Sequence, residues 1–449
     1  MSLRPHPTPG DTSWFTHDRF GLFIHWGTYS AAARHEWVKN YERIPEEKYR
    51  IYFETFNPDL YDPQRWARAA REAGMRYFVI TTKHHEGFCL WDTQYTDYKA
   101  PNTPCGRDLL KPMVEAFRAE GLQVGFYYSL IDWHHPDFPI DPVHPRREDK
   151  AALARNSRRK IKRYAEYMRN QVRELLTQFG KIDILWLDFS YPAVKAKPPL
   201  SPGKGRKDWE SEKLYALIRE LQPHVILNDR LDLDKGWDIK TPEQYQPREW
   251  LRENGKPVTW EACQTFSGSW GYHRDETSWK SEHQLVTMLI DTVSKGGNLL
   301  MNVGPTARGE FDHRALNALT QYGEWMKRHE RSIHGCTQAP VGLKTPQDCR
   351  LTYNQKLNRA YLHIFSWPFK NIHMPAWAGK IKYAQLLNDA SEVRFNEITK
   401  TTSNPHDHMT GHRELGSVVL ELPVLKPDVT IPVVELFLKG TSGNRASDR

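Results

Sequence analysis

Carboxylate and histidine side chains follow short apolar runs in the first part of the chain. Asp188 ends the apolar run 181–187, and His84 and His85 follow the run 75–82. If these runs are parallel strands, their carboxyl ends meet at one edge, so we expect the polar side chains to gather there. Two carboxyl groups at such an edge can act as nucleophile and acid/base in glycoside hydrolysis, roughly 5 Å apart when the configuration is retained.

Motifs of several other chemistries are missing from the sequence. It contains no GxSxG elbow, no P-loop and no GxGxxG segment. His84 and His85 are adjacent, and neighbouring side chains diverge on an extended chain, so we do not expect a zinc site with three or four converging ligands. The sequence favours carboxylate chemistry without a metal or an organic cofactor, although any one of these side chains taken alone is as readily explained by a structural role.

The elements that must position these residues alternate between strand and helix. Runs typical of strands lie at 20–26, 75–82, 122–129, 182–188, 224–229, 257–262 and 298–304. Helical patterns lie at 63–74, 107–121, 146–176, 212–223 and 281–297. This alternation predicts an α/β fold with a parallel sheet, and strands buried on both faces favour a (β/α)8-like TIM barrel. Seven strands are counted, so one strand is missed or degenerate.

The pattern changes near residue 340. Alternating strand patterns lie at 359–367, 381–388, 417–423 and 433–440, with turn residues between them and no helical pattern. This texture predicts a C-terminal all-β sandwich domain. We place the catalytic barrel domain at 1–340 and the β-sandwich domain at 341–449.

Composition limits the partners. The net charge of +8 is concentrated in 146–176, where helical spacing indicates a solvated basic face, and no nucleic-acid motif accompanies it. The 16 Trp residues are typical either of core packing or of platforms for sugar rings.

No apolar run follows Met1 and no 18 apolar residues are consecutive, so neither a signal peptide nor a membrane span is predicted. The chain as written is expected to be cytoplasmic, or periplasmic or secreted if a signal was removed; its oligomeric state stays open.

Six segments together resemble, in order, the motifs of glycoside hydrolase family 29, the α-L-fucosidases. They are "FGLFIHWG", "TTKHHEGFCLW", "FYYSLIDWHHPD", "TPEQYQP", "WEACQTFSGSWGY" and "SKGGNLLMNVGP". The resemblance runs from about residue 14 to 335 and is nearest to the branch that tolerates many leaving groups. It implies a retaining exo-glycosidase that removes terminal α-L-fucosyl residues from oligosaccharides or glycoconjugates through a covalent intermediate, without a metal or cofactor.

The same resemblance implies roles for individual residues. The nucleophile is Asp188 of "WLD". The family does not fix the position of the acid/base, and we prefer Glu243 of "TPEQY", because a loop acid past the "NDR" strand can reach the leaving group. The competing candidate is Glu261 of "TWEAC", which directly follows a strand and could instead hold an Arg or His side chain. Trp270 is expected to pack on the C6 methyl group of the sugar. The other residues expected to contact the sugar are His25, Glu36, Trp37, His84, His85, Tyr127, Trp186 and Arg230.

Two other functions stay open at this point. One is a related barrel glycosidase for another sugar such as galactose, and the other is a fucose-binding protein without catalytic activity. The irregular segment 190–209 is expected near the rim of the site, but its pattern does not indicate which glycosidic linkage is preferred.

Overall fold

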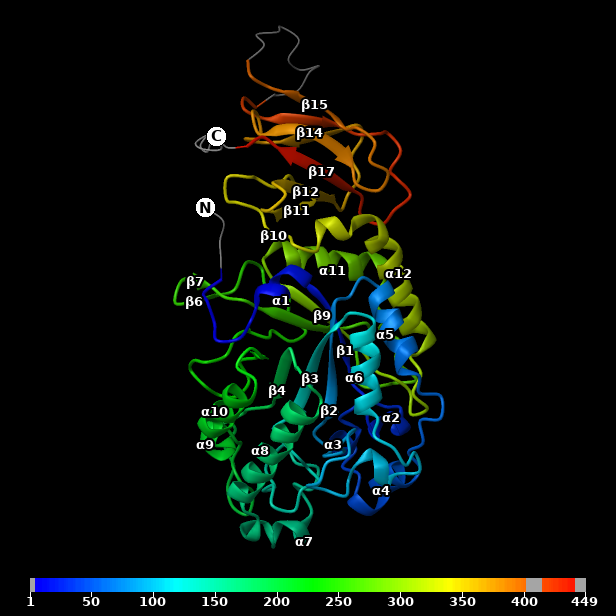
Figure 1. Cartoon of the computed structure of the whole chain (residues 1–449), viewed down its shortest axis with the longest axis vertical. Coiled ribbons are helices and arrows are strands. Elements are labelled where there is room, and N and C mark those ends of the chain that lie inside the picture. The colour runs from blue at the N-terminus through cyan, green and yellow to red at the C-terminus, as the bar shows by residue number, and fades with distance from the viewer. Residues whose placement is uncertain (1–4, 401–413, 441–449) are drawn as a thin grey trace.

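The computed structural model describes residues 5–400 and 414–440. A parallel barrel comes first in the chain, and antiparallel sheets follow it (Figure 1). The barrel strands are β1 (Phe20–Ile24), β2 (Tyr77–Lys83), β3 (Gln123–Ser129), β4 (Ile184–Asp188), β5 (Ile226–Leu227), β8 (Glu261–Thr265) and β9 (Asn298–Val303). The helices are α1 (Ser13–Asp18), α2 (Tyr29–Ala32), α3 (Val38–Tyr41), α4 (Glu46–Glu54), α5 (Pro63–Glu72), α6 (Leu110–Ala119), α7 (Lys150–Leu153), α8 (Ile161–Gln178), α9 (Arg206–Trp209), α10 (Ser211–Leu221), α11 (Glu282–Ser294) and α12 (His313–His329). Within the described ranges, no helix is both long and apolar enough to cross a membrane.

The barrel is closed by an irregular segment. Seven strands form one sheet in the order β5-β4-β3-β2-β1-β9-β8, and every neighbouring pair is parallel. Residues 239–243 lie between its two edges, with a parallel bridge from Ile239 to the end of β5 and parallel bridges from Lys240 and Glu243 to the β8 side. The predicted seven strands and the (β/α)8-like barrel are therefore confirmed, and the degenerate strand is 239–243. Pro242 has no backbone N–H to donate to a neighbouring strand, so it interrupts the strand pattern of this segment.

The helices cover the outer faces of the strands, as α5 illustrates. The side chain of Asp62 accepts a hydrogen bond from the backbone N–H of Arg65, and Pro63 occupies the first helical position, where no N–H is needed. Trp66 is buried on the inner face of the helix. Gly74, with φ of +84°, turns the chain from the helix toward β2.

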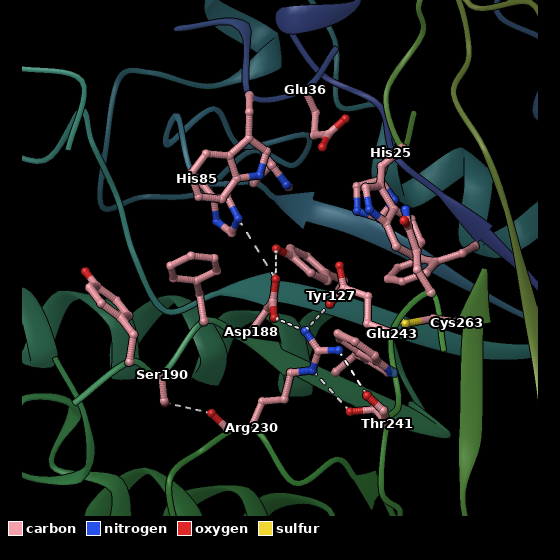
Figure 2. A pocket seen from close by; sticks show the side chains of 18 of the residues that line it. His25, Glu36, His85, Tyr127, Asp188, Ser190, Arg230, Thr241, Glu243 and Cys263 are labelled. Carbon is pink, nitrogen blue, oxygen red and sulfur yellow. Dashed lines mark hydrogen bonds and ion pairs between the residues drawn. The ribbon is translucent and has the colours of Figure 1, made fainter. Parts of the chain in front are cut away.

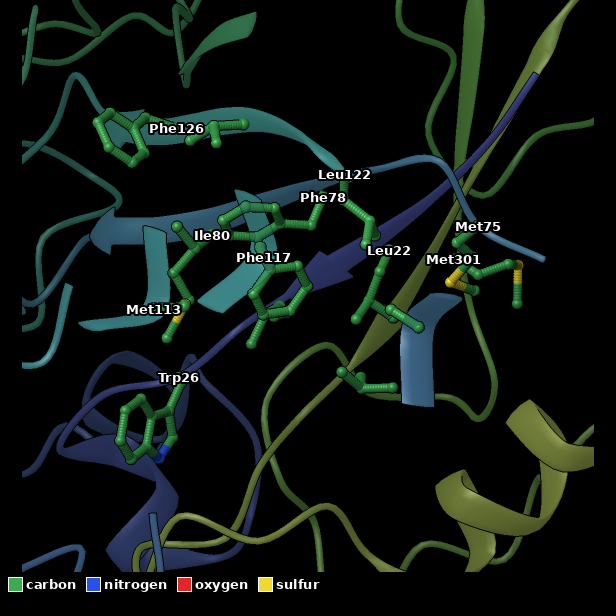
Figure 3. Packing of buried hydrophobic residues seen from close by; sticks show 14 of the residues in the cluster. Leu22, Trp26, Met75, Phe78, Ile80, Met113, Phe117, Leu122, Phe126 and Met301 are labelled. Carbon is green, nitrogen blue, oxygen red and sulfur yellow. The ribbon is translucent and has the colours of Figure 1, made fainter. Parts of the chain in front are cut away.

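Aromatic and aliphatic side chains fill the layer between strands and helices (Figure 3). Phe78 of β2 stacks on Phe117 of α6 with ring centroids 3.9 Å apart, and Met113 of α6 packs into the same layer. Each large buried side chain contributes roughly 1.5–3 kcal/mol by leaving water. This packing makes the strands a stiff support for the residues at their ends.

Two antiparallel sheets form the C-terminal part. One has the order β10-β11-β12-β17-β14 and the other β13-β16-β15. Their strands are β10 (Thr337–Gln338), β11 (Cys349–Asn354), β12 (Arg359–Ile364), β13 (Asn371–Met374), β14 (Ile381–Leu386), β15 (Arg394–Glu397), β16 (Val418–Glu421) and β17 (Val433–Leu438), and a short hairpin of β6 (Arg252–Glu253) and β7 (Lys256–Pro257) lies earlier in the chain. A separate apolar cluster draws on both sheets, so the predicted sandwich is confirmed. The boundary at 340/341 stays a prediction.

The predicted basic helix at 146–176 is only partly correct. Its second half is α8, but its first half is the short helix α7 followed by a 3₁₀ turn. The side chain of Asn156 explains the break, because it bonds the backbone N–H and C=O of Ile140 and the C=O of Pro199. These bonds tie the segment to neighbouring loops instead of to a continuous helix.

Candidate active site

A cavity of about 860 Å³ lies at the carboxyl ends of the barrel strands (Figure 2). The predicted site residues that line it are His25, Glu36, Trp37, His84, His85, Tyr127, Trp186, Asp188, Arg230, Glu243 and Trp270. Glu261 is the predicted site residue that does not line it. The structure thus brings together side chains from segments spread over about half of the chain.

Asp188 is the last residue of β4, and only 8% of it is exposed. Its Oδ1 lies 2.7 Å from Nη1 of Arg230, and its Oδ2 accepts a hydrogen bond of 2.7 Å from the hydroxyl of Tyr127 (Figure 2). Burial, and then the charge of Asp188, raise the pKa of Tyr127 well above its usual value, so its hydroxyl keeps the proton that it donates. A charged and a neutral donor therefore each hold one oxygen of the Asp188 side chain at the strand end.

Arg230 joins Asp188 to Glu243. Its Nη1 lies 2.7 Å from Oδ1 of Asp188 and 2.7 Å from Oε2 of Glu243. Its Nε and Nη2 donate to the hydroxyl and the carbonyl of Thr241, both at 3.1 Å, and its guanidinium lies 4.4 Å above the Trp186 ring. Burial lowers the pKa of Arg230, but Asp188 and Glu243 outweigh that effect and raise it. Because both carboxylate oxygens contact the same nitrogen atom, these two oxygens are at most twice 2.7 Å apart, close enough for both carboxyl groups to reach one sugar.

Glu243 reaches this position because residues 239–243 replace a barrel strand. The residue forms a parallel bridge to Cys263 of β8, so it ends the degenerate strand as Asp188 ends β4. Its side chain is 43% exposed, against 11% for that of Asp188. One carboxylate of the pair is therefore enclosed, while the other faces the open side of the cavity.

Two histidines present nitrogen acceptors to the cavity. Nδ1 of His25 lies 2.6 Å from Oδ1 of Asn302, whose amide nitrogen donates to the carbonyl of Trp270. Nδ1 of His85 lies 2.7 Å from the hydroxyl of Ser129, which donates its own proton to a backbone carbonyl. Both Nδ1 atoms therefore carry a proton, and both Nε2 atoms are free to accept one. Burial first, and the other histidines second, lower the pKa of His25 and His85 well below the usual value, so both rings are neutral.

His84 and His85 do not diverge, because the chain bends directly after β2. Both rings line the cavity, with centroids 4.0 Å apart. β2 ends at Lys83, and the backbone N–H of Gly87 bonds the carbonyl of His84 in a turn that needs the φ of +89° at Gly87. The turn swings both rings to one side. Among the described residues, no group of three or more His, Cys, Asp or Glu side chains is arranged to hold a metal ion.

Glu36 and Trp270 are held against each other by the backbone of Gly271. Oε2 of Glu36, which is 1% exposed, accepts a 2.8 Å hydrogen bond from the N–H of Gly271. A side chain at Gly271 would come within 3.0 Å of the backbone of Glu36, so the close approach requires glycine. The ring of the preceding Trp270 lies 5.2 Å from that of His25. A carboxylate, an imidazole and an indole thus form one wall of the cavity.

Glu261 lies in the floor of the barrel. It was expected at the end of a strand, but it is the first residue of β8, so it faces the interior far from the mouth. It is fully buried, and it accepts hydrogen bonds from the hydroxyl of Tyr77 at 2.7 Å and from Nε1 of Trp186 at 3.1 Å. Burial raises its pKa to about 7, although both hydrogen bonds act in the opposite direction.

Several cavity residues were not predicted. They include His35, Tyr41, Phe189, Tyr191, Asp232 and Gln244. Phe189 and Tyr191 follow the Asp188 strand directly, and Tyr41 lies four residues after Trp37, which is one helical turn. Position next to a predicted site residue was the signal available for these three.

A (β/α) barrel with a carboxylate pair among His and Trp side chains at its mouth is the architecture of a glycoside hydrolase. A family model described as alpha-L-fucosidase matches residues 3–331. The chain therefore belongs to the α-L-fucosidase family, which confirms the resemblance seen in the sequence motifs, and it is a glycoside hydrolase.

Individual relatives agree with this assignment. The chain is 28% identical to the plasma α-L-fucosidase of Rattus norvegicus over 94% of this chain and 89% of that protein. It superposes on α-L-fucosidase isoenzyme 1 from Paenibacillus thiaminolyticus with a TM-score of 0.86 and 44% identity, covering 96% of this chain and 99% of that one. A trapped covalent intermediate of a GH29 α-L-fucosidase from Bacteroides thetaiotaomicron, in complex with 2-fluoro-fucosyl fluoride, is similar with a TM-score of 0.79 and 26% identity, covering 98% of each chain.

Proposed function

We propose that the protein is a retaining exo-α-L-fucosidase in which Asp188 is the nucleophile and Glu243 the acid/base. The observation that carries this proposal is the single Arg230 nitrogen that lies 2.7 Å from both carboxylates. This shared contact supports the proposal because it keeps the two carboxyl groups close together, as a retaining pair at roughly 5–5.5 Å requires. The trapped covalent intermediate of the related Bacteroides enzyme supports a two-step route.

In the first step Asp188 attacks C1 of the fucosyl unit. A bond forms between C1 and a carboxylate oxygen, and the bond between C1 and the aglycone oxygen breaks with its electron pair leaving on that oxygen. Protonated Glu243 donates its proton there, so the aglycone departs as a neutral alcohol. Arg230 contacts both carboxylates and stabilises the charge that moves between them.

In the second step a water molecule replaces the aglycone. Glu243, now ionised, takes a proton from the water as its oxygen attacks C1, and the ester electrons return to Asp188. Tyr127 and Arg230 donate one hydrogen bond each to Asp188, so both of its oxygens are supported when it regains its charge. Two inversions at C1 leave the released fucose with its original configuration.

Glu243 suits the acid/base role better than Glu261. An acid/base must exchange a proton with the leaving group and with water, and the side chain of Glu243 is 43% exposed at the mouth. Glu261 is fully buried, and the indole of Trp186 occupies one of its oxygens. We assign Glu261 a supporting role. It accepts a hydrogen bond from Nε1 of Trp186, and the guanidinium of Arg230 lies over the face of the Trp186 ring.

The cavity walls match a deoxy sugar. The neutral rings of His25 and His85 present Nε2 acceptors for sugar hydroxyls, with His84 beside them and the Glu36 carboxylate in the same wall as His25. The faces of Trp37 and Trp270 are apolar surfaces for ring C–H groups. We place the C6 methyl group against Trp270, where a hydroxyl would lose its hydrogen bonds to water.

A pair of chromogenic substrates tests this function against its alternatives. The 4-nitrophenyl α-L-fucoside and α-L-galactoside differ only by a hydroxyl on C6. We expect the fucoside to be hydrolysed about tenfold to a hundredfold faster in kcat/KM, the discrimination that an apolar pocket achieves against one added hydroxyl. Faster hydrolysis of the galactoside would favour the galactosidase alternative. Binding of fucose without hydrolysis of either substrate would favour the binding-protein alternative.

A further inference from the structure

Four aromatic side chains form a continuous arc along the cavity wall beside Asp188. The arc consists of Tyr41, Trp37, Phe189 and Tyr191, and all four line the cavity. Tyr41 stacks on Trp37 with ring centroids 5.8 Å apart and planes 27° apart. Trp37 lies 5.3 Å from Phe189, which lies 5.1 Å from Tyr191. The arc therefore runs without a gap from α3 to the loop after β4.

The inner members of this aromatic arc are fixed by their surroundings. Phe189 has φ of +83°, a conformation that side-chain-bearing residues rarely adopt, and its ring lies 5.0 Å from that of His85. Packing holds the backbone in this conformation immediately after Asp188. The hydroxyl of Tyr191 donates a 2.6 Å hydrogen bond to the buried Asp141.

The outer member is exposed. Tyr41 has 64% of its surface in contact with solvent, although one ring face is covered by Trp37. A large ring that faces water inside a cavity provides a platform that a ligand can cover. Trp37, one helical turn away, supports it from behind.

The cavity is also larger and more acidic than a fucose site requires. A volume of about 860 Å³ is at the upper end of the range for drug-sized ligands, so it has room beyond one deoxy sugar. Arg230 is the cation among the lining side chains that the structure describes, and it is already paired with two carboxylates. The lining carboxylates are Glu36, Asp188, Asp229, Asp232 and Glu243. This balance disfavours an anionic ligand.

We propose that the exposed outer end of the aromatic arc, Tyr41, is the binding platform for the leaving group, a neutral sugar whose C–H face lies on the Tyr41 ring. This inference rests on the proposed function, since it takes the aglycone to leave on the side of Asp188 and Glu243. The exposed residue Gln244, which also lines the cavity, supplies hydrogen bonds to the hydroxyl edge of that sugar. Tyr41 then determines how efficiently a fucosylated glycan is hydrolysed relative to a substrate with a small leaving group.

The test compares two substrates that differ in the leaving group. α-L-fucosyl fluoride has no aglycone sugar, and the second substrate is whichever of the 1,2-, 1,3-, 1,4- and 1,6-linked fucosyl disaccharides the wild type hydrolyses fastest. The readout is the ratio of kcat/KM for the disaccharide to kcat/KM for the fluoride. We expect Tyr41→Ala to lower this ratio about tenfold and Tyr41→Trp to keep it within about twofold, because an indole also offers a flat apolar face.

Tyr95→Ala is the matched control, because Tyr95 is 44% exposed and does not line the cavity. The ratio should be unchanged in this variant. A sulfate on the second sugar should lower kcat/KM in the wild type, and more strongly at low ionic strength.

The outcomes separate the inference from the proposed function. The role of the arc would be overturned if Tyr41→Ala left the ratio unchanged, including the case in which kcat/KM falls equally for both substrates. It would also be overturned if Tyr95→Ala lowered the ratio as much as Tyr41→Ala. Hydrolysis of the fluoride by the wild type with none of the disaccharides would also overturn it. Failure of the wild type to hydrolyse the fluoride would instead contradict the proposed function.

Discussion

The floor and the mouth of the barrel each hold a carboxyl group bonded by a tyrosine hydroxyl at 2.7 Å. In the floor, Tyr77 donates to Glu261. At the mouth, Tyr127 donates to Asp188. The floor carboxyl has a tryptophan N–H as its second donor, whereas the mouth carboxyl has the cation Arg230. The same side-chain types therefore create two different electrostatic environments within one fold.

The difference shows what turns a buried acid into a reactive one. Without a cation and without solvent, Glu261 has its pKa raised by burial to about 7, so it is only about half ionised at neutral pH. Asp188 is paired with a cation and borders a cavity, so the cation stabilises its carboxylate and a ligand can reach it. Accessibility and a paired charge, more than the hydrogen bond from tyrosine, distinguish the proposed nucleophile.

The largest expected effect is at Asp188. Asp188→Ala should lower kcat for the 4-nitrophenyl fucoside by at least about 10⁴-fold, because it removes the group that forms the covalent bond. Azide can enter the vacated space and attack C1 directly, so the product should be the inverted β-fucosyl azide. Binding of fucose, measured by calorimetry, controls for folding. Residual activity above a few per cent of the wild type would contradict the assignment.

The second effect is at Glu243. Glu243→Ala should lower kcat/KM by about 10² to 10⁴-fold for a disaccharide, whose leaving group needs a proton, and by less for an activated aryl fucoside. Azide should restore turnover of the aryl substrate and give α-fucosyl azide, because it attacks the intermediate from the face that Glu243 occupied. If azide rescues Glu261→Ala and leaves Glu243→Ala unchanged, Glu261 is the acid/base.

The smallest effect on catalysis is at Glu261. Glu261→Gln should stay within about tenfold of the wild type in kcat/KM, because it preserves the shape beneath Trp186. Its larger consequence is for stability. The pKa of Glu261 rises from 4.5 to about 7 on folding, so the folded chain retains a proton that the unfolded chain releases between these values.

This proton makes the stability of the wild type fall as pH rises through that interval. The free energy of unfolding of the wild type minus that of Glu261→Gln should decrease by about 3 kcal/mol between pH 4.5 and pH 7. Urea unfolding of both proteins, followed by tryptophan fluorescence at several pH values, measures the difference. A difference that does not change with pH would show that Glu261 is ionised in the folded protein.

The parts of the site that the sequence predicted are those on regular elements. Asp188 and His25 follow continuous apolar runs, so their place at the mouth came from the strand pattern itself. Glu243 was predicted as a loop acid after the "NDR" strand and not as the end of a strand, because Pro242 conceals the strand pattern of 239–243. The position of Glu261 was predicted wrongly. The apolar pattern predicted a strand at 257–262, which puts Glu261 near its end, whereas β8 begins at Glu261.

The aromatic arc had no periodic pattern to reveal it. Tyr41 belongs to a four-residue helix, and Phe189 depends on a positive φ that packing imposes. Such features are determined by contacts between distant segments, such as the one between the Trp37 and Phe189 rings at 5.3 Å. Regular elements are visible in a sequence, while the loops that complete a site require the fold.

The most direct test of the account is to find the atom that bonds to the sugar. The wild type is incubated with 2-fluoro-fucosyl fluoride, digested with trypsin, and analysed by tandem mass spectrometry. The account predicts one fucosyl label in the peptide 182–195, carried by Asp188 and not by Asp183, with none in the Asp188→Ala variant. A label on another residue, or its persistence in Asp188→Ala, would contradict it.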